Sequence, residues 1–422
     1  MSEFFNILNG ILNSILQVFA WVWWIVIPLG LIFIAWDFWK FYIHFKFLKT
    51  VKYNLLEIHI PKDIIKTPKS MENIFATFHA TKMSIDTLKK KYIEGQTQLW
   101  LSLEIVGTGG GVAFYIRTPE QFRNLIEAQI YAQYPDAEIV EAEDYVSFLP
   151  KDLPNKYFDI WAAEFGLAKD SAYPIKTYPY FEEVKEEKRL DPIASWVETM
   201  SKLKSDERIW IQILTKYTGD DWKKEADKLV AKLAGKKSPK AEMGLFDWIW
   251  QFLRNLIKAP VVYPEWGEEA AEKEGPASQM QSLTPGEKDI IKAIEEKASK
   301  LGFETVVRCI YIDRREAFSR LNVSSIMGGI NQFNTQNMNA FKPFKPTSIS
   351  AKPPFKSQKE FLKKRMLYLN YRMRMLNRHI KAILNTEELA TIYHFPIMAV
   401  EAPFLRRIEA KKGEPPINLP IG

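Results

Sequence analysis

The sequence has few of the residues that metal and redox sites use. Among 422 residues there are one cysteine and five histidines. A single cysteine, Cys309, excludes an internal disulfide and fits a reducing compartment. It lies in an apolar stretch, where a small buried hydrophobic side chain is the expected role. C-x-x-C and H-E-x-x-H motifs are absent and the histidines are scattered, so we predict no metal site.

Motifs for binding phosphate or for catalysis are also missing. No G-x-x-x-x-G-K-[S/T] loop occurs, and the glycine-rich stretch 107–111 joins two apolar runs without opening a helix, which predicts a hairpin. The acids Glu138, Glu141, Glu143 and Asp144 lie in and just after the short predicted strand 137–140; they have no nucleophile beside them and fit a strand edge that ends in a solvated loop. We therefore expect no catalytic residues, no cofactor and no enzymatic activity.

Charge is absent from a long stretch near the N-terminus. No charged residue lies between Glu3 and Asp37, and residues 15–36 are almost entirely apolar. About 20 apolar residues are enough to span a bilayer as a helix. Basic residues follow at Lys40 and Lys46, which by the positive-inside rule predicts a single-pass protein of the inner membrane, with its N-terminus outside and its body in the cytoplasm. A buried core helix is the alternative, and a cleaved signal peptide is disfavoured because a basic first region is lacking.

Basic charge is concentrated in one segment. Residues 359–381 hold eight lysines and arginines and one acid, a net charge of +7 that equals the net charge of the whole chain. Aromatic, leucine and methionine side chains are interleaved with them. Such a helix suits nucleic acid, through phosphate contacts and base stacking, or anionic lipid headgroups. The alternative is a helix that packs its apolar face on the body. The candidate binding residues are Lys363, Lys364, Arg365, Arg372, Arg374 and Arg378.

Two regions show a similar order of strand and helix signals. Residues 53–145 read as β-α-β-β-α-β, the ferredoxin-like or split βαβ arrangement. Its first helix has apolar residues at helical spacing, at positions 71, 74, 75 and 78. Residues 174–340 repeat the pattern: Phe318, Leu321 and Ile326 follow Tyr311 at the same offsets at which positions 122, 125 and 130 follow Tyr115. We predict an α+β fold with two ferredoxin-like modules.

The second region contains an insertion, 217–283. Within it, residues 244–258 have one apolar face beside two tryptophans, which suits a helix in the membrane interface and equally a helix packed on a module or partner. The candidate interface residues are Phe246, Trp248, Trp250 and Phe252. Thr284 and Glu287 then have the spacing of a capping box and predict a helix start.

These patterns divide the chain into successive parts. They are an N-terminal segment (1–14), a transmembrane helix (15–36), the first module (53–145), the second module with its insertion (174–340), a linker (341–357), and a basic helix with a C-terminal tail (358–422).

Several segments are similar to known proteins. Residues 56–61, 100–106, 122–135, 383–396 and 409–416 resemble the membrane-anchored N-terminal half of type IV secretion or conjugative DNA-transfer ATPases of the HerA/FtsK superfamily. The most specific parts are 127–135 and 384–396. In that superfamily the Leu-Asn-Thr-Glu-Glu-Leu stretch, here 384–389, leads into a RecA-like motor domain. This chain stops at Gly422, where the motor would begin, so no ATP site is carried over.

The resemblance implies that the protein is a non-catalytic scaffold for a secretion or conjugation machine. Its expected partner is a separate ATPase motor, and several copies of the chain are expected to form a ring. DNA is a further possible partner. The residues expected to dock the motor are Asn385, Glu387, Glu388, His394 and Phe395. The alternative function is a membrane-tethered protein that binds nucleic acid or anionic lipid through residues 359–381.

Overall fold

The structure is a computed structural model. It describes residues 2–61, 66–181, 190–234, 283–377, 379–380 and 382–396. In the first helix, side chains are described at positions 20, 23 and 24 and from residue 27 onward.

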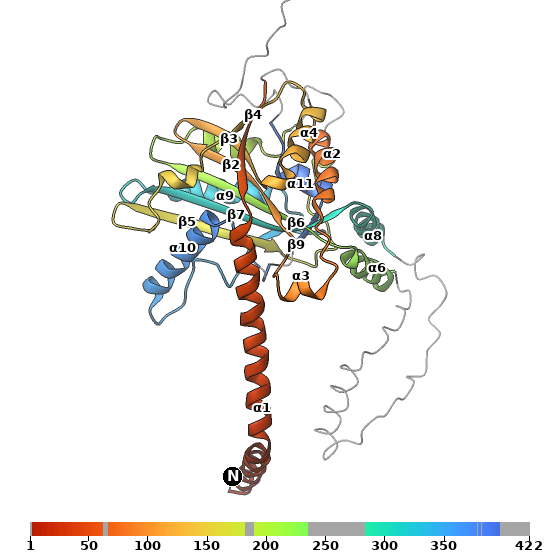
Figure 1. The fold of residues 1–422 in the computed structure, drawn as a ribbon, viewed down its shortest axis with the longest axis vertical. Helices are drawn as coiled ribbons and strands as arrows, with labels where there is room; N and C mark the ends of the chain where they lie inside the picture. The colour runs from red at the N-terminus through yellow and green to blue at the C-terminus, as the bar shows by residue number, and fades with distance from the viewer. Residues whose placement is uncertain are drawn as a thin grey trace, which may run out of the picture.

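The body is built on one nine-stranded sheet (Figure 1). Its strands are β1 (Tyr53–His59), β2 (Trp100–Thr108), β3 (Gly111–Pro119), β4 (Glu138–Glu141), β5 (Phe158–Leu167), β6 (Arg208–Tyr217), β7 (Gly302–Arg314), β8 (Phe341–Pro343) and β9 (Ala382–Asn385). They lie in the order β4-β1-β3-β2-β6-β7-β5-β8, β9 pairs with β7, and every described pair is antiparallel. The strands are long runs of Val, Ile, Leu and aromatic residues, which pack well on a pleated surface buried on both faces.

The prediction of two ferredoxin-like modules is wrong, because strands from both regions form one continuous sheet. β2 of the first region pairs with β6 of the second along its whole length, from Trp100 opposite Lys216 to Thr108 opposite Arg208. Joining two edges satisfies backbone groups that separate modules would leave exposed. One apolar core also runs through both regions. The fold is a mixed α/β body on a large antiparallel sheet.

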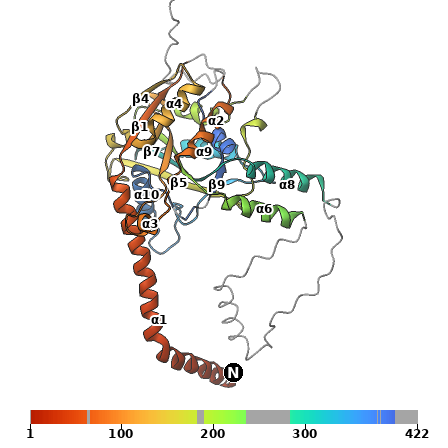
Figure 2. The same ribbon diagram turned by 45° about the vertical axis from the view of Figure 1, so that its right-hand side comes forward.

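Helices lie on both faces of the sheet and at its end (Figure 2). They are α1 (Ser2–Thr50), α2 (Lys69–Phe78), α3 (Leu88–Tyr92), α4 (Arg123–Gln133), α5 (Ala194–Ser201), α6 (Asp221–Leu233), α8 (Pro285–Ala298), α9 (Arg320–Asn331), α10 (Lys356–Arg372) and α11 (Thr386–Ile392). The predicted capping box is confirmed at the start of α8, where the Thr284 hydroxyl accepts from the Glu287 N–H and the Glu287 carboxylate accepts from the Thr284 N–H.

The two faces of the sheet have different covers. Buried side chains of α2, α4, α5, α9 and α11 pack on one face and form the larger core. The other face is covered by α10, through Leu367, Tyr368 and Tyr371, and by the short 3-10 segment Tyr145–Phe148. α6 and α8 pack on each other at the end of the sheet through Trp222 and Ile294. Alternate residues of each strand point to opposite faces of the sheet. Every second side chain of a strand therefore faces the helices of the larger core, and the others face α10 and the 3-10 segment.

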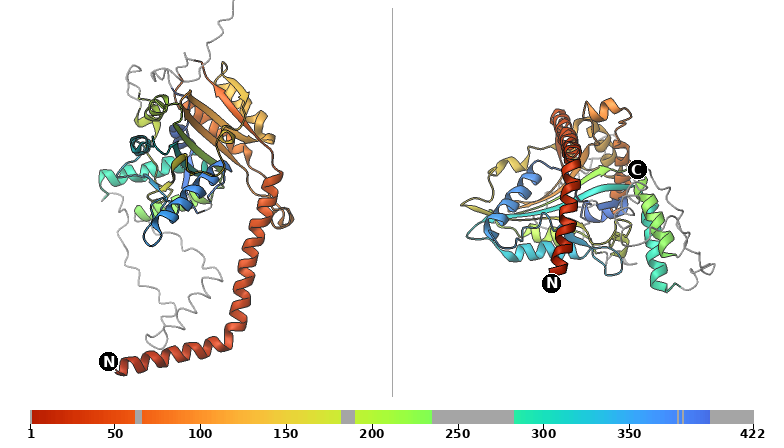
Figure 3. Two further views of the ribbon diagram at one scale, coloured as in Figure 1. Left: turned by 90° about the vertical axis from the view of Figure 1, so that its left-hand side faces the viewer. Right: turned by 90° about the horizontal axis from the view of Figure 1, so that it is seen from below.

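α1 is a 49-residue helix that extends away from the body (Figures 1 and 3). Its C-terminal part lies on the body: Ile43 is buried, and the Trp39 indole N–H donates to the Tyr92 carbonyl at 3.1 Å. Within the described residues, no helix combines the length and the apolar composition that crossing a membrane requires. This finding overturns the predicted transmembrane helix at 15–36, the single-pass description and the inner-membrane location. The apolar stretch is one part of a longer helix that continues without a break into a charged segment docked on the body.

Two other predicted segments differ in extent. The predicted linker, 341–357, begins with β8, which pairs with β5. The basic helix, predicted over 359–381, is α10 and ends at Arg372, after which the chain turns and enters β9. The predicted interface helix, 244–258, lies outside the described residues.

Candidate functional site

Four polar side chains form a row across the sheet on the face that α10 covers. Glu104 on β2 lies opposite Gln212 on β6, Gln212 lies opposite Arg308 on β7, and Arg308 lies opposite Glu164 on β5. All four are at most 1% exposed. The antiparallel register alone aligns them, because each sits at an α10-facing position of its strand. We call these four residues the polar row.

Hydrogen bonds link the polar row from one end to the other. Arg308 donates to the Glu164 carboxylate, from Nε at 3.0 Å and from Nη2 at 2.5 Å, and to the Gln212 amide oxygen at 2.5 Å. The Gln212 amide then donates to Glu104 at 3.2 Å. Hydrogen bonds to charged groups are stronger than neutral ones, and they offset part of the cost of burying these charges.

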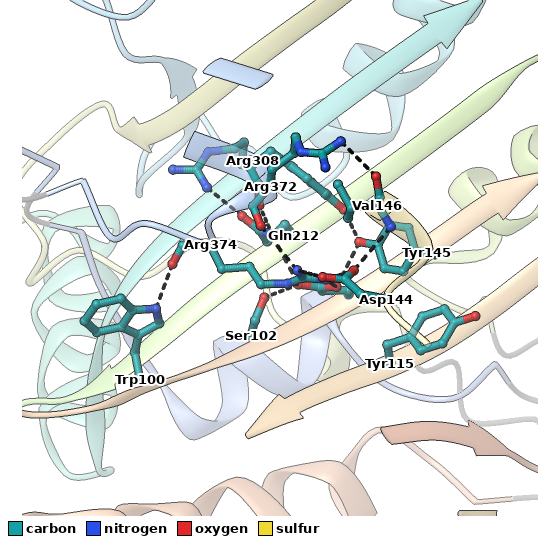
Figure 4. A network of polar contacts seen from close by, with 12 residues as sticks. Trp100, Ser102, Tyr115, Asp144, Tyr145, Val146, Gln212, Arg308, Arg372 and Arg374 are labelled. Carbon is teal, nitrogen blue, oxygen red and sulfur yellow. Dashed lines mark hydrogen bonds and ion pairs between the residues drawn. The ribbon is translucent and has the colours of Figure 1, made fainter. Parts of the chain in front are cut away.

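A further charged residue, the fourth of the network, is Arg374, which enters from the turn after α10 (Figure 4). Its guanidinium donates to both Glu104 oxygens, at 2.8 and 3.1 Å, and makes a two-point contact with Asp144 at 2.7 and 2.9 Å. Tyr145 donates to Glu104 at 2.8 Å, and its hydroxyl lies 2.6 Å from that of Tyr371. Arg374 therefore bridges the sheet to the loop that precedes the 3-10 segment.

The pKa shifts follow from burial and from this pairing. Burial alone would raise the pKa of Glu104, but the Arg374 charge and the hydrogen bonds that Glu104 accepts hold it below its usual value. The pKa of Asp144 is lowered in the same way, with Arg374 outweighing burial. Burial raises the pKa of both Tyr145 and Tyr371 well above the usual tyrosine value. At neutral pH Glu104 and Asp144 are therefore ionised, and the Tyr145 and Tyr371 phenols are neutral.

The network fixes the turn that ends α10. Backbone carbonyls in and beside this turn accept hydrogen bonds from the polar row. Arg308 donates to the carbonyls of Asn370 at 3.2 Å and Met375 at 2.9 Å, and Gln212 donates to the carbonyl of Tyr371 at 3.2 Å. The Arg374 carbonyl accepts from the Trp100 indole at 2.8 Å, and Arg374 has a left-handed φ of 48°. A backbone conformation that is unfavourable by itself persists only where the surrounding contacts hold it in place. The polar row therefore sets how α10 lies on the sheet.

The basic residues predicted to bind polyanions have several different environments. Lys363 donates to the carbonyls of Ser348 and Ser350, Lys364 pairs with Asp159 at 2.7 Å, and Arg365 is exposed. Arg372 donates to carbonyls before β5, at Val146 (2.9 Å) and Leu149 (3.0 Å). Arg374 is 1% exposed, so it is unavailable to a ligand on the surface. Arg378 lies outside the described residues.

The predicted docking residues lie in a segment that is part of the body. β9 adds to β7, and α11 packs on α2. Asn385 starts α11 with a capping box, in which its side chain accepts from the Glu388 N–H at 2.8 Å and the Glu388 carboxylate accepts from its N–H at 2.9 Å. The buried Glu388 pairs with the buried Lys297 at 2.9 Å. Burial lowers the pKa of Lys297, although Glu388 opposes the shift.

The other docking candidates are also held by the body. Glu387 pairs with Lys300, which also contacts Glu72 at 2.6 Å. His394 is buried, with its Nε2 3.1 Å from Asp191, and Phe395 packs in the larger core. Asn385 and Glu387 line a cavity with a volume of about 270 Å³. The rest of its lining includes Lys176, Tyr180, Glu296, Asn337 and Met338.

The polar row was not predicted from the sequence, although a signal was present. Each of its members carries a charged or amide side chain and has apolar residues on both sides in the sequence, as in Ile211-Gln212-Ile213 and Val307-Arg308-Cys309. A lone polar residue inside a buried strand needs a partner on the same face. What the sequence could not supply was the register that aligns the four. Among the described residues, no group of three or more His, Cys, Asp or Glu side chains could hold a metal ion.

Comparison with known families identifies a match that covers most of the body. A family model described as a domain of unknown function, DUF8128, matches residues 52–405. The chain belongs to this family. The matched range contains all nine strands, the polar row and the segment from β9 to α11. No curated protein matches the chain.

Proposed function

We propose that this protein is a non-catalytic scaffold that docks a separate RecA-like ATPase in a type IV secretion or conjugative DNA-transfer machine. The observation that carries the proposal is the position of residues 383–396. This segment resembles the entry to the motor domain in such ATPases, and here it is built into the body as β9 and α11. A motor attached to or docked beside it would therefore have a fixed position relative to the sheet.

Burial decides which surface is available for docking. Glu388, His394 and Phe395 are at most 3% exposed, so a partner cannot reach them without unfolding the segment. Asn385 is also only 3% exposed, so the part of the cavity that a partner can reach is lined by Glu387, which is partly exposed, and by Tyr180, which is 69% exposed. An exposed tyrosine beside a cavity is typical of residues that contribute strongly to binding. We assign docking to this cavity.

The experiment is co-purification with the RecA-like ATPase encoded beside this chain. The paired change Tyr180→Glu and Asn337→Arg should weaken retention of the ATPase at least tenfold, because loss of a central aromatic contact typically has an effect of this size. The change Tyr157→Glu is the matched control, since Tyr157 is 63% exposed and does not line the cavity. Equal retention by both variants would contradict the proposal.

A truncation separates the segment from the tail that follows it. Deletion from residue 384 onward would remove Leu384, Leu389 and Tyr393 from the core and damage the fold. A chain that ends at Pro396 keeps these residues. If it folds and retains the ATPase, docking resides in the body and its cavity; if it folds and loses the ATPase, docking requires the tail and the cavity assignment fails.

A further inference from the structure

α10 has two apolar faces, and the sheet covers only one of them. Leu367, Tyr368 and Tyr371 point into the core and are fully buried. Four other apolar residues, spaced by three or four positions, point outward. They are Leu362 (61% exposed), Met366 (43%), Leu369 (38%) and Met373 (53%), and we call them the outer stripe. At 3.6 residues per turn, the outer stripe lies on one side of the helix, opposite the face that packs on the sheet.

Basic residues border the outer stripe on both sides. Lys359 and Arg365 are exposed and lie about 60° to either side of Leu362 around the helix axis. Lys352 and Lys356 are exposed at the N-terminal end of α10. The one acid of α10, Glu360, lies on the sheet-facing side and within 3.9 Å of Lys356. The outer stripe is thus an apolar surface with a basic border.

The outer stripe continues towards α1. A cavity of about 520 Å³ between the two helices is lined by Met366 and Asn370 of α10 and by Phe41 and Phe45 of α1. Phe41 and Tyr42 of α1 are themselves more than half exposed, as is Met373. Figures 1 and 3 place α10 on the side of the body from which α1 extends. Apolar surface from two helices is therefore gathered on one side of the body.

We propose that the outer stripe of α10 docks on an anionic lipid surface. Leucine and methionine side chains would enter the boundary between headgroups and acyl chains, and Lys359 and Arg365 would contact the phosphates beside them. An apolar face with a lysine and arginine border is the composition of helices that lie in a lipid interface. This is a contact along the surface of the bilayer, and it does not depend on the proposed docking of an ATPase.

The same geometry disfavours nucleic acid as the occupant. Single-stranded nucleic acid binds by stacking its bases on aromatic side chains. The tyrosines of α10 are buried, with Tyr368 bonded to the Pro150 carbonyl and Tyr371 in the polar network. The outer stripe itself holds only leucine and methionine, and the exposed aromatic residue of α10, Phe361 (42% exposed), lies about 100° around the helix from Leu362.

The test uses the full chain with an environment-sensitive dye at a single position. Cys309 is fully buried and burial raises the pKa of its thiol, so a cysteine introduced at the surface is the one that reacts. The dye is placed on Leu369→Cys and, as control, on Lys223→Cys, an exposed position of α6. Vesicles of phosphatidylcholine alone are compared with vesicles that contain 30% phosphatidylglycerol. A blue shift at 369 and none at 223, with the anionic vesicles, is expected.

Charge variants provide the second measurement. Lys359→Glu with Arg365→Glu should lower binding to the anionic vesicles about tenfold or more, and leave binding to neutral vesicles unchanged. Lys223→Glu with Lys288→Glu makes the same change in charge on α6 and α8 and should have no such effect. Because α1 is present in every variant, its own contribution cancels. Absence of the blue shift at 369, equal binding by both charge variants, or a dye response to single-stranded DNA and not to vesicles would overturn the proposal.

Discussion

At the residue scale, the pairing of Arg374 with Glu104 and Asp144 shows why charge alone does not reveal a binding surface. Arg374 lies in the most basic segment of the chain, yet its guanidinium contacts two carboxylates in the interior. Long basic side chains often cover apolar surface with their stems and place their charge wherever a partner lies. The sequence gives the density of charge in 359–381 but not the direction of each side chain.

Loss of this arginine should destabilise the body. Arg374→Met keeps a residue of similar length and leaves Glu104 buried without its counterion, which typically costs about 3–5 kcal/mol. The double change Arg374→Met and Glu104→Gln should cost less, because no uncompensated charge then remains at position 104. Urea unfolding of the wild type, the two single variants Arg374→Met and Glu104→Gln, and the double variant measures the difference. If the double variant is as unstable as the sum of the single variants, the two residues are not coupled.

The lowered pKa of Glu104 and of Asp144 predicts the acid dependence of stability. A carboxyl whose folded-state pKa lies below its unfolded value stabilises the fold above the unfolded pKa, about 4, and that stability is lost as the pH falls through the folded pKa. The free energy of unfolding should therefore fall with pH below about 4. In Glu104→Gln the slope should be shallower. The same change at the exposed Glu316 should leave the slope as it is in the wild type, and an unaltered slope in both variants would contradict the assignment.

At the element scale, helix contacts depend on close approaches that periodicity does not show. The apolar positions of α2 were predicted from their spacing, and Met71, Ile74, Phe75 and Phe78 are all buried. The contact between α5 and α9 depends on a glycine. A Cβ on Gly329 would overlap the buried Trp196 indole, whereas a Cβ on Gly328 would meet open space.

These two neighbouring glycines of α9 provide a matched pair. Gly328→Ala should stabilise the protein by about 0.5–1 kcal/mol, because alanine is the better helix former. Gly329→Ala should destabilise it by about 1–3 kcal/mol, since the rigid Trp196 ring or the helix must shift. Thermal unfolding of both variants checks the signs. Equal effects of the two substitutions would show that α9 does not lie against Trp196 as described.

At the scale of the whole molecule, sequence patterns predict where strands lie along the chain better than they predict which strands pair with each other. The order of strands and helices over residues 53–145 was predicted, because alternation and apolar runs are local signals. The pairing of β2 with β6 joins residues that are 100 or more positions apart, from Thr108 with Arg208 to Trp100 with Lys216. It is made by backbone hydrogen bonds, which do not depend on the identity of the side chains. For the same reason the polar row could not be predicted. In the sequence its members are four separate polar residues, and only the register of the strands places them side by side.

The pairing of β2 with β6 also has a practical consequence for dividing the chain. A fragment cut between the two halves would end its sheet at β2, a nine-residue strand with seven buried positions. Its amide and carbonyl groups would then be free to recruit the nearest matching strand, which in a concentrated solution is the β2 of another fragment. Half of this protein, prepared alone, should self-associate, and shorter versions are better made by trimming the ends than by cutting the middle.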